Sequence, residues 1–318
     1  MRPISVNQMI PAEYAGERVD RVAAQLLSDF SRAELTRWIA AGELTLDGQT
    51  VKPKTKVAGG EHLRLDAQRT VREAWEEPQA MPLEVLYEDE DLIILNKPAG
   101  LVVHPGAGNR DQTLVNGLLH YRPALGQLAR AGVVHRLDKE TSGVMVVAAS
   151  ELAQLRLSRM IASRRVQRRY VCVCEGRMVA GQDVDAPIGR DPHVRTRQAV
   201  REDGKPAQTQ FRVQERFRTH TLVDARLLTG RTHQIRVHMQ SIGYPLVGDR
   251  RYGARGKVPG GSSPSLIEVV HGFRRQALHA QALAFEHPIT GEEVSASTDW
   301  PDDFDVLVTA LRADASGL

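Results

Sequence analysis

The residues best suited to chemistry form one short charged segment, HRLD at 135–138, inside the run VVHRLDKETSGVMVVA at 133–148. Apolar residues typical of β-strands flank this segment, so we expect one strand to end at Val134 and another to run over 144–148. A loop held between two strands is a rigid platform for a reactive side chain. The segment therefore offers its carboxylate, Asp138, in a fixed position.

Two cations adjoin Asp138 in the sequence, Arg136 and Lys139. Nearby positive charge keeps a carboxylate ionised where solvent access is low. An ionised, partly dry carboxylate can act as a nucleophile or as a base. On its own, an Arg-Leu-Asp tripeptide more often caps a turn than performs chemistry, so the rest of the sequence has to distinguish the two interpretations.

The composition describes an ordinary globular chain of 318 residues, long enough for about two domains of ~150 residues each. No apolar run approaches the roughly 18 residues that cross a bilayer, and no secretion signal is visible. Cys172 and Cys174 alternate as in a strand, and we expect them to pack in the core rather than to form a disulfide or bind metal. These features indicate a reducing cytoplasm and no membrane partner.

Positive charge is concentrated in one stretch, residues 156–169, although the net charge of the chain is only +3. This stretch contains no Asp or Glu. Such clusters are typical of phosphate binding, and a solvated helix face is the simpler alternative. The stretch contains six arginines: Arg156, Arg159, Arg164, Arg165, Arg168 and Arg169.

Residues 16–66 are expected to form a small separate αβ module. Apolar spacing predicts a helix over 18–27. A second helix is predicted to start at Ser31, which forms a capping-box pair with Glu34, and to end before Gly42.

A hairpin is predicted for 44–51, because Asp47-Gly48 is a preferred pair in tight turns, and a further strand is predicted for 62–66. Two helices followed by a hairpin, with basic side chains around them, resemble the S4 RNA-binding domain. The resemblance implies that this module contacts RNA through residues that include Arg32 and Arg37.

Residues 67–82 are polar and contain two prolines, so we interpret them as a linker. The remainder, 83–310, is expected to be a larger domain that mixes strands and helices. We predict strands over 92–95, 144–148, 171–174 and 222–228, and helices near 150–163 and 232–242.

Two segments on either side of the charged loop carry candidate site residues. LNKPAGLVVHPG at 95–106 contains Lys97 and Pro98, which on spacing alone form only a turn. RRYVCVCEG at 168–176 opens a strand with Tyr170. A tyrosine in such a position is more often a core residue than a catalytic one.

A third segment, LLTGRTHQIRVHM at 227–239, leads from a strand into a helix that Thr232 can cap. Arg236 follows His233 by about one turn. The two histidines of this segment are five residues apart, which is poor spacing for metal ligands on one helix face, so we predict no metal site.

Taken in this order with HRLDKETSG at 135–143, these segments resemble the RluA family of pseudouridine synthases. The resemblance implies that Asp138 is the essential catalytic residue and that Arg236 pairs with it. It also implies that Tyr170 is an active-site residue whose ring can stack on the target pyrimidine and whose hydroxyl can move a proton.

The resemblance gives further residues structural or binding roles. Lys97 and Pro98 are expected to support the catalytic loop, and Arg136 to fill the space that the target base leaves. In YPLVGDRRYG at 244–253, Leu246 is expected to line the pocket.

Another segment, 189–211, resembles the part of the family that grips RNA, and we expect a mobile, positively charged loop there. The remaining residues expected to bind substrate or RNA are Lys139, Arg195, Arg197, Lys205 and Arg231.

The fold that the resemblance implies is α+β: a long, mixed, mostly antiparallel sheet flanked by helices, preceded by the small S4-like domain. The implied reaction converts a C–N glycosidic bond into a C–C bond by rearrangement, so no cofactor is expected. The sequence also contains no G-x-G-x-x-G or P-loop motif at a suitable position.

The expected partner is RNA, and within the family the sequence is most similar to the branch that modifies 23S rRNA of the large ribosomal subunit. Two alternatives stay open: a pseudouridine synthase that acts on tRNA, and a non-catalytic RNA-binding factor for ribosome assembly. We expect a monomer.

Overall fold

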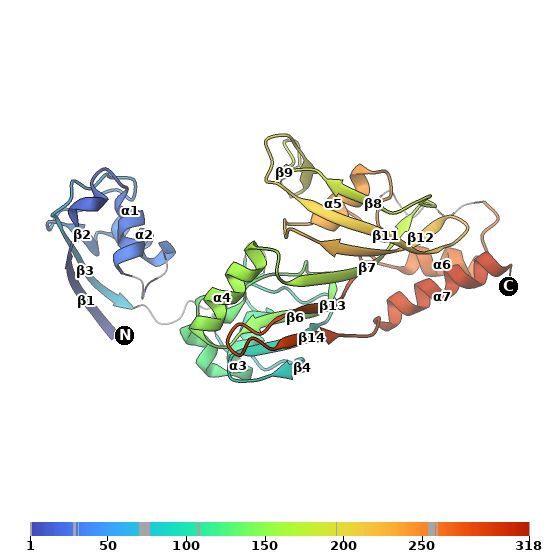
Figure 1. The fold of residues 1–318 in the computed structure, drawn as a ribbon, viewed down its shortest axis with the longest axis horizontal. Helices are drawn as coiled ribbons and strands as arrows, with labels where there is room; N and C mark the ends of the chain where they lie inside the picture. Colours follow the sequence, from blue (N-terminus) through green and yellow to red (C-terminus); the bar gives the residue numbers. More distant parts are fainter. Residues whose placement is uncertain are drawn as a thin grey trace. The chain divides into compact units, whose positions relative to one another are not determined.

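The computed structural model describes residues 2–27, 30, 32–69, 77–106, 109–194, 196–253, 258 and 260–317. The chain divides into two compact units, Met1–Ala74 and Trp75–Leu318, each with a hydrophobic core of its own. Their elements are labelled in Figure 1. In the part of the chain that is described, no helix is long and apolar enough to cross a membrane.

The first unit is a three-stranded antiparallel sheet, in the order β1-β3-β2, packed against two helices. Apolar residues on one side of each helix, such as Val22 and Trp38, are buried with residues of β3 such as Leu65. The elements are β1 (Arg2–Met9), η1 (Ala12–Tyr14), α1 (Val19–Leu26), α2 (Arg32–Ala41), β2 (Leu44–Leu46) and β3 (His62–Arg69). The proposed capping box of α2 lies outside the described residues.

The predicted hairpin over 44–51 is wrong in its second strand. Asp47 and Gly48 do form the tight turn, with φ of 48° and 76°, and Leu46 bridges Gln49 across it. However, β2 pairs with β3 and not with the residues after the turn. The longer β3 provides a complete ladder of backbone hydrogen bonds and holds Leu46 in the core.

The first unit begins earlier than the predicted boundary at residue 16, because β1 pairs with β3 along its eight residues. An edge strand with one exposed face carries few apolar residues, which concealed it in the sequence.

Of the predicted linker, 67–82, residues 67–69 belong to β3, and the backbone N–H of Gln79 donates to the carbonyl of Asn116 in the second unit at 3.0 Å. Residues 70–76 lie outside the described part.

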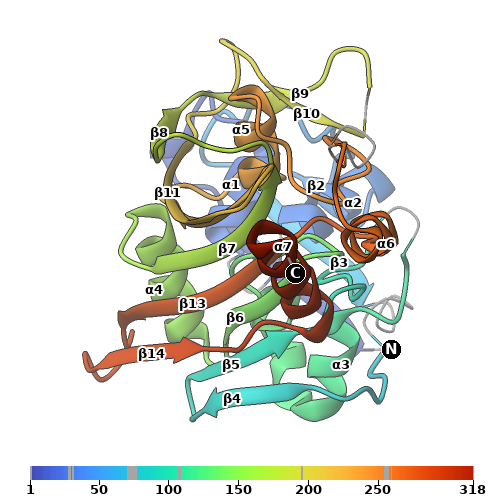
Figure 2. The ribbon, with the colours of Figure 1, turned by 90° about the vertical axis from the view of Figure 1, so that its right-hand side faces the viewer.

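The second unit is built on a nine-stranded, mostly antiparallel sheet (Figure 2). Neighbouring strands follow the order β4-β5-β6-β13-β7-β12-β11-β8, and β14 pairs with β13. Among the described strands, only β6 and β13 are parallel partners. The predicted α+β class is confirmed. The strands are β4 (Glu84–Glu88), β5 (Leu92–Lys97), β6 (Ser142–Ala148), β7 (Gln167–Glu175), β8 (Gln182–Asp185), β11 (Gln208–Arg216), β12 (His220–Leu227), β13 (Leu278–Glu286) and β14 (Glu293–Ser297).

Helices cover both faces of this sheet. Residues of α3 and α5 share a core with Ile93 and Cys172 on one face, whereas α4 packs on Val146 and α6 and α7 pack on Val171 on the other. The helices are α3 (Leu114–Tyr121), η3 (Pro123–Gln127), η4 (Ala129–Gly132), α4 (Glu151–Ala162), α5 (Gln234–Ser241), α6 (Pro264–Gly272) and α7 (Asp302–Ser316). The strands and helices predicted for this unit are confirmed at most positions.

The strand expected to end at Val134 does not form. The segment η4 ends directly before Val133, and two of its residues, Arg130 and Ala131, have positive φ values that are not helical. Val133 makes a single β-bridge, to Val147. The charged loop over 135–141 therefore follows an irregular turn and continues into β6. The apolar residues here are buried without forming a strand, because Val133 and Leu137 both lie in the core.

The segment 189–211 is also more ordered than the sequence suggested. β9 (Ile188–Arg190) and β10 (Gln198–Val200) form an antiparallel two-stranded ribbon, and Lys205 bridges Ile188. Arg190 ends β9, and Arg197 and Arg201 adjoin the two ends of β10, so these positive residues lie on or directly beside a regular ribbon.

Gly143 permits the close approach of β6 to β13. Its φ is 116°, and a Cβ atom here would lie 2.1 Å from the carbonyl oxygen of Ala280. We expect Gly143→Ala to lower the free energy of unfolding by at least ~3 kcal/mol, because the backbone conformation and the contact both exclude a side chain. Urea denaturation measures this loss.

Gly272, at the end of α6, provides the control, since a Cβ atom added there would meet nothing within 4 Å. Gly272→Ala should leave stability unchanged or raise it by up to ~1 kcal/mol. A Gly143→Ala protein as stable as wild type would contradict the argument.

Candidate active site

The carboxylate of Asp138 forms an ion pair with Arg236, although the two residues are far apart in the sequence. Arg236 Nη1 donates to Asp138 Oδ2 at 2.9 Å. The loop that precedes β6 supplies the aspartate, and the first turn of α5 supplies the arginine. The sequence-based pairing of these two residues is thus present in the structure.

Arg236 is held from its other side by Asp249. Its Nε and Nη2 donate to the two carboxylate oxygens of Asp249 at 2.7 and 2.9 Å, and the Asp249 side chain is fully buried. Burial alone would raise the pKa of Asp249, but its hydrogen bonds to Arg236 and the charge of Arg236 hold this pKa below its ordinary value. One guanidinium group therefore serves two carboxylates.

Tyr252 connects this arginine to the β9–β10 ribbon. The guanidinium carbon of Arg236 lies 4.9 Å from the centre of the Tyr252 ring, in cation–π contact. The Tyr252 hydroxyl bonds to Nδ1 of His233 at 2.7 Å and accepts from the backbone N–H of Gln198 in β10 at 2.8 Å. Arg197 lies over the same ring at 5.2 Å. The ribbon and the Asp138 site thus share a neighbour.

The sequence predicted that Thr232 caps the N-terminus of α5, and this prediction is wrong. The cap residue is His233, in a left-handed conformation with φ of 58°, and no side chain caps the helix there. Instead, the Gln234 carboxamide oxygen accepts from the backbone N–H of Arg231 and from the hydroxyl of Thr229. The left-handed turn sets the direction in which α5 begins.

Lys97 connects the turn after β5 to the loop of Asp138. Its ammonium group donates to the carbonyls of Pro98, Leu101 and Lys139 at 2.7, 2.9 and 3.1 Å. The residue is fully buried, and burial lowers its pKa to about 7. Three carbonyl acceptors around one ammonium group fit the supporting role predicted for Lys97 and Pro98, which stays a prediction.

Arg275 supports the end of the same loop and was not identified from the sequence. Its Nη1 donates to the carbonyl of Glu140 at 3.3 Å, and its Nε and Nη2 bond to the carboxylate of Asp303. Asp249, Tyr252 and Arg275 were all missed, because nothing in the sequence near each one indicates a partner far along the chain.

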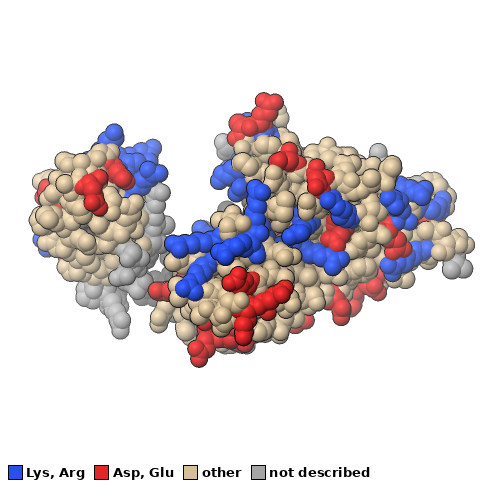
Figure 3. Space-filling view, in the orientation of Figure 1, with Lys and Arg blue, Asp and Glu red and all other residues tan. Residues whose placement is uncertain are grey.

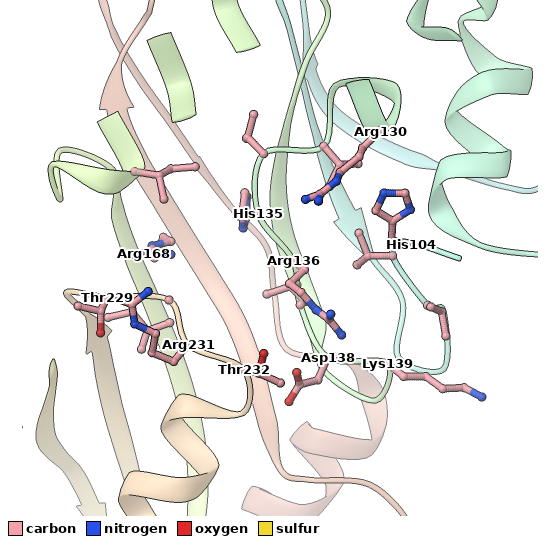
Figure 4. A pocket seen from close by; sticks show the side chains of 18 of the residues that line it. His104, Arg130, His135, Arg136, Asp138, Lys139, Arg168, Thr229, Arg231 and Thr232 are labelled. Carbon is pink, nitrogen blue, oxygen red and sulfur yellow. The ribbon is translucent and has the colours of Figure 1, made fainter. Parts of the chain in front are cut away.

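A cavity of about 1010 Å³ opens beside Asp138 (Figure 4). Its walls combine the Asp138 loop with Tyr170 of β7 and the loop that carries Arg231. Tyr170 is 5% exposed, and burial raises the pKa of its hydroxyl, so the phenol is neutral. Arg136 and Lys139 also line the cavity and are exposed.

Leu246 does not line this cavity, contrary to the prediction. It is fully buried and makes a β-bridge with Cys174, packed in the same core as Ile235. Its apolar side chain is covered on all sides because the chain at this point runs beside the end of β7.

The other predicted RNA-binding residues are not among those that line the cavity. Lys205 is exposed beside the ribbon, and Arg37 is exposed in the first unit. The side chain of Arg32 and all of Arg195 lie outside the described residues. Among the residues that are described, no group of three or more His, Cys, Asp or Glu side chains is placed to hold a metal ion.

Comparison with known proteins supports the two resemblances found in the sequence, to pseudouridine synthases and to the S4 domain. A family model described as RNA pseudouridylate synthase matches residues 91–241, and an S4 domain model matches 17–63. The chain is 50% identical to ribosomal large subunit pseudouridine synthase D of Vibrio parahaemolyticus, over 98% of this chain and 96% of that protein. Its identity to the protein of that name from Xanthomonas campestris is 49%, over 97% and 93%.

Among solved structures, human RNA pseudouridylate synthase domain containing 4 matches 72% of this chain and 93% of its own, with 27% identity and a TM-score of 0.58. The chain therefore belongs to the RNA pseudouridine synthases, enzymes that isomerise uridine to pseudouridine. The resemblance to this family and to the S4 domain is confirmed.

His135 lines the cavity, and its Nε2 accepts a hydrogen bond from the backbone N–H of Val146 at 3.1 Å. Burial, reinforced by the charge of Arg168, lowers its pKa to about 3. The unfolded chain binds this proton near pH 6.5, so the free energy of unfolding falls as the pH drops below 6.5. We expect this residue to lower the free energy of unfolding by about 2 kcal/mol at pH 5 and to have no such effect above pH 7.

His135→Gln retains an acceptor for Val146 but does not titrate. Thermal unfolding of both proteins at pH 7.5 and at pH 5 should show a smaller acid loss for the variant. Equal losses in the two proteins would mean that His135 is protonated as readily in the folded chain as in the unfolded one.

Proposed function

We propose that this enzyme isomerises specific uridines of 23S rRNA to pseudouridine, with Asp138 as the catalytic carboxylate. The observation that carries the proposal is the Asp138–Arg236 ion pair at the wall of a cavity large enough for a nucleotide. The relatives that match nearly the whole chain are named for the ribosomal large subunit, which supports rRNA as the substrate.

The reaction breaks the N1–C1′ bond of uridine, turns the uracil and joins C5 to C1′. The hydrogen on C5 leaves as a proton and N1 gains a proton, so the overall change is an isomerisation. Asp138 either attacks C1′ or removes a proton from the sugar, and the ion pair with Arg236 fixes the direction of its carboxylate. The neutral ring of Tyr170 provides a surface on which the detached uracil can stack.

RNA binding is supported by the distribution of charge. In Figure 3, Lys and Arg side chains gather over α4 and along β7 of the second unit. Arg156, Arg159, Arg164 and Arg165 are exposed on α4 and just after it. The S4 domain of the first unit adds a second RNA-binding element, in which Arg32 and Arg37 are our candidate contacts.

The test is to map pseudouridines in 23S rRNA by carbodiimide treatment and primer extension. Cells that lack the gene are complemented with wild-type protein or with Asp138→Asn. We expect specific stops to vanish in the deletion and to return only with wild type, because an amide can neither attack the sugar nor take its proton. Purified Asp138→Asn should still bind the RNA.

Asp299→Asn is the control, because Asp299 is exposed and lies outside the cavity. It should restore every stop. If the stops persist in the deletion, 23S rRNA is not the substrate, and tRNA modification and a non-catalytic role in ribosome assembly become the alternatives to test. If Asp138→Asn restores the stops, Asp138 is not the catalytic carboxylate.

Arg136 is proposed to fill the space in the RNA that the target base leaves. It is exposed at the cavity wall. Because unstacking a base costs a few kcal/mol, we expect Arg136→Ala to lower kcat/KM on rRNA about tenfold or more without changing the melting temperature. Arg274→Ala removes an exposed arginine outside the cavity and should retain wild-type kinetics. Wild-type kinetics for Arg136→Ala would refute the role.

A further inference from the structure

Arg168 is a buried arginine to which the described chain offers no counter-charge. Only 6% of its surface is exposed, and its Nε atom has no hydrogen-bond acceptor among the residues that the structure describes. Within the described part of the chain, no carboxylate lies within ion-pair distance of its guanidinium group. The reaction described above uses Arg236 and leaves Arg168 without a role.

The other buried arginines of the described chain differ in this respect. Arg236 and Arg275 are each 7% exposed, and each has a carboxylate that accepts two hydrogen bonds. Burying an arginine without such an anion costs several kcal/mol, since the charge loses its water and gains no counter-charge. Arg168 therefore lies in a site that an external anion would complete.

The site of Arg168 opens into the cavity beside Asp138. Arg168 lines this cavity and, by the alternation of strand β7, projects from the same face of the sheet as Tyr170. Figure 4 shows its side chain in the wall between His135 and Arg231. Gly230 makes room for it, because a Cβ atom there would lie 2.9 Å from Arg168 Nη1.

The described groups around Arg168 do not supply the missing negative charge. His135 and Tyr170 are neutral at physiological pH, because burial lowers the pKa of the first to about 3 and raises that of the second. Asp138 is already paired with Arg236. The wall is therefore locally positive in the protein without RNA.

We propose that Arg168 binds the backbone phosphate next to the target uridine when its base occupies the cavity. The proposal rests on the function proposed above, and it names one contact between the enzyme and its RNA. Arg168 and Tyr170 are two residues apart on a strand, which is about 7 Å, and this spacing matches the reach from a base that stacks on Tyr170 to its own phosphate. Phosphate is the anion that RNA brings to every nucleotide, and a guanidinium group can bind it with two hydrogen bonds.

Stability in the absence of RNA provides the first test. Arg168→Met removes an uncompensated charge and keeps a long apolar side chain, so its melting temperature should equal or exceed that of wild type. Arg275→Met is the matched control: it leaves Asp303 without its partner and should melt at a lower temperature. A clear loss of stability in Arg168→Met would show that the charge serves the fold.

The second test pairs the variant with a neutral substrate. On an rRNA fragment that wild-type protein modifies, Arg168→Met should lower kcat/KM about 10- to 100-fold, the effect of losing one charge-assisted hydrogen-bonded contact. A methylphosphonate, which is uncharged, then replaces one phosphate at a time on either side of the target uridine. At one of these positions wild type should lose activity by a similar factor, and Arg168→Met should lose nothing further.

Arg177→Gln is the control for total charge, since Arg177 is exposed, lies two residues after the end of β7 and is outside the cavity. It should behave as wild type with every substrate. If Arg168→Met and each methylphosphonate act independently, so that their losses multiply at both positions, Arg168 does not bind that phosphate. If wild type modifies no rRNA fragment, the proposed function fails first, and that outcome is separate from a failure of the phosphate contact.

Discussion

The active site depends on one guanidinium group shared by two carboxylates. Arg236 gives two of its donors to the fully buried Asp249 and a third to Asp138, which lies at the cavity. The bidentate pair fixes the plane of the guanidinium group, so the remaining donor points in one direction only. The position of Asp138 is thus determined from the core outward, through the turn that carries Asp249 and the helix that carries Arg236.

In the loop of Asp138, cationic side chains supply hydrogen bonds that a neighbouring strand would otherwise supply. This loop lies beside the sheet without forming a strand, so its carbonyls need donors from elsewhere. Lys97 supplies one to Lys139, and Arg275 supplies one to Glu140. A loop held by long side chains has a less regular path than a strand, and this irregular path is what lets a polar residue face the cavity.

Much of this fold follows from the sequence, because apolar runs of strand length and helical spacing identify most elements. The apolar pattern predicted correctly that Val133 is buried, but it did not predict the conformation there. A residue in a strand and a residue that makes one isolated β-bridge are both apolar when they are buried, so the pattern does not distinguish them. The burial of Leu246 and the left-handed turn at His233 could not be predicted either. Both result from how the chain is directed by distant elements.

The same limit applies to the site. The charged loop and its candidate residues Asp138 and Arg236 are visible because their neighbours in the sequence form a specific pattern. Asp249 and Arg275 have no such local signal, and only the three-dimensional arrangement gives them partners.

The order in which these residues occur along the chain has a consequence for synthesis of the protein. Asp138 leaves the ribosome before Arg236 and Asp249 have been made, and Arg275 follows later still. The first unit, with its own core, is complete long before any of them. A growing chain can therefore fold its S4 domain while its carboxylate is still unpaired, and the site assembles only when the last third of the chain has emerged.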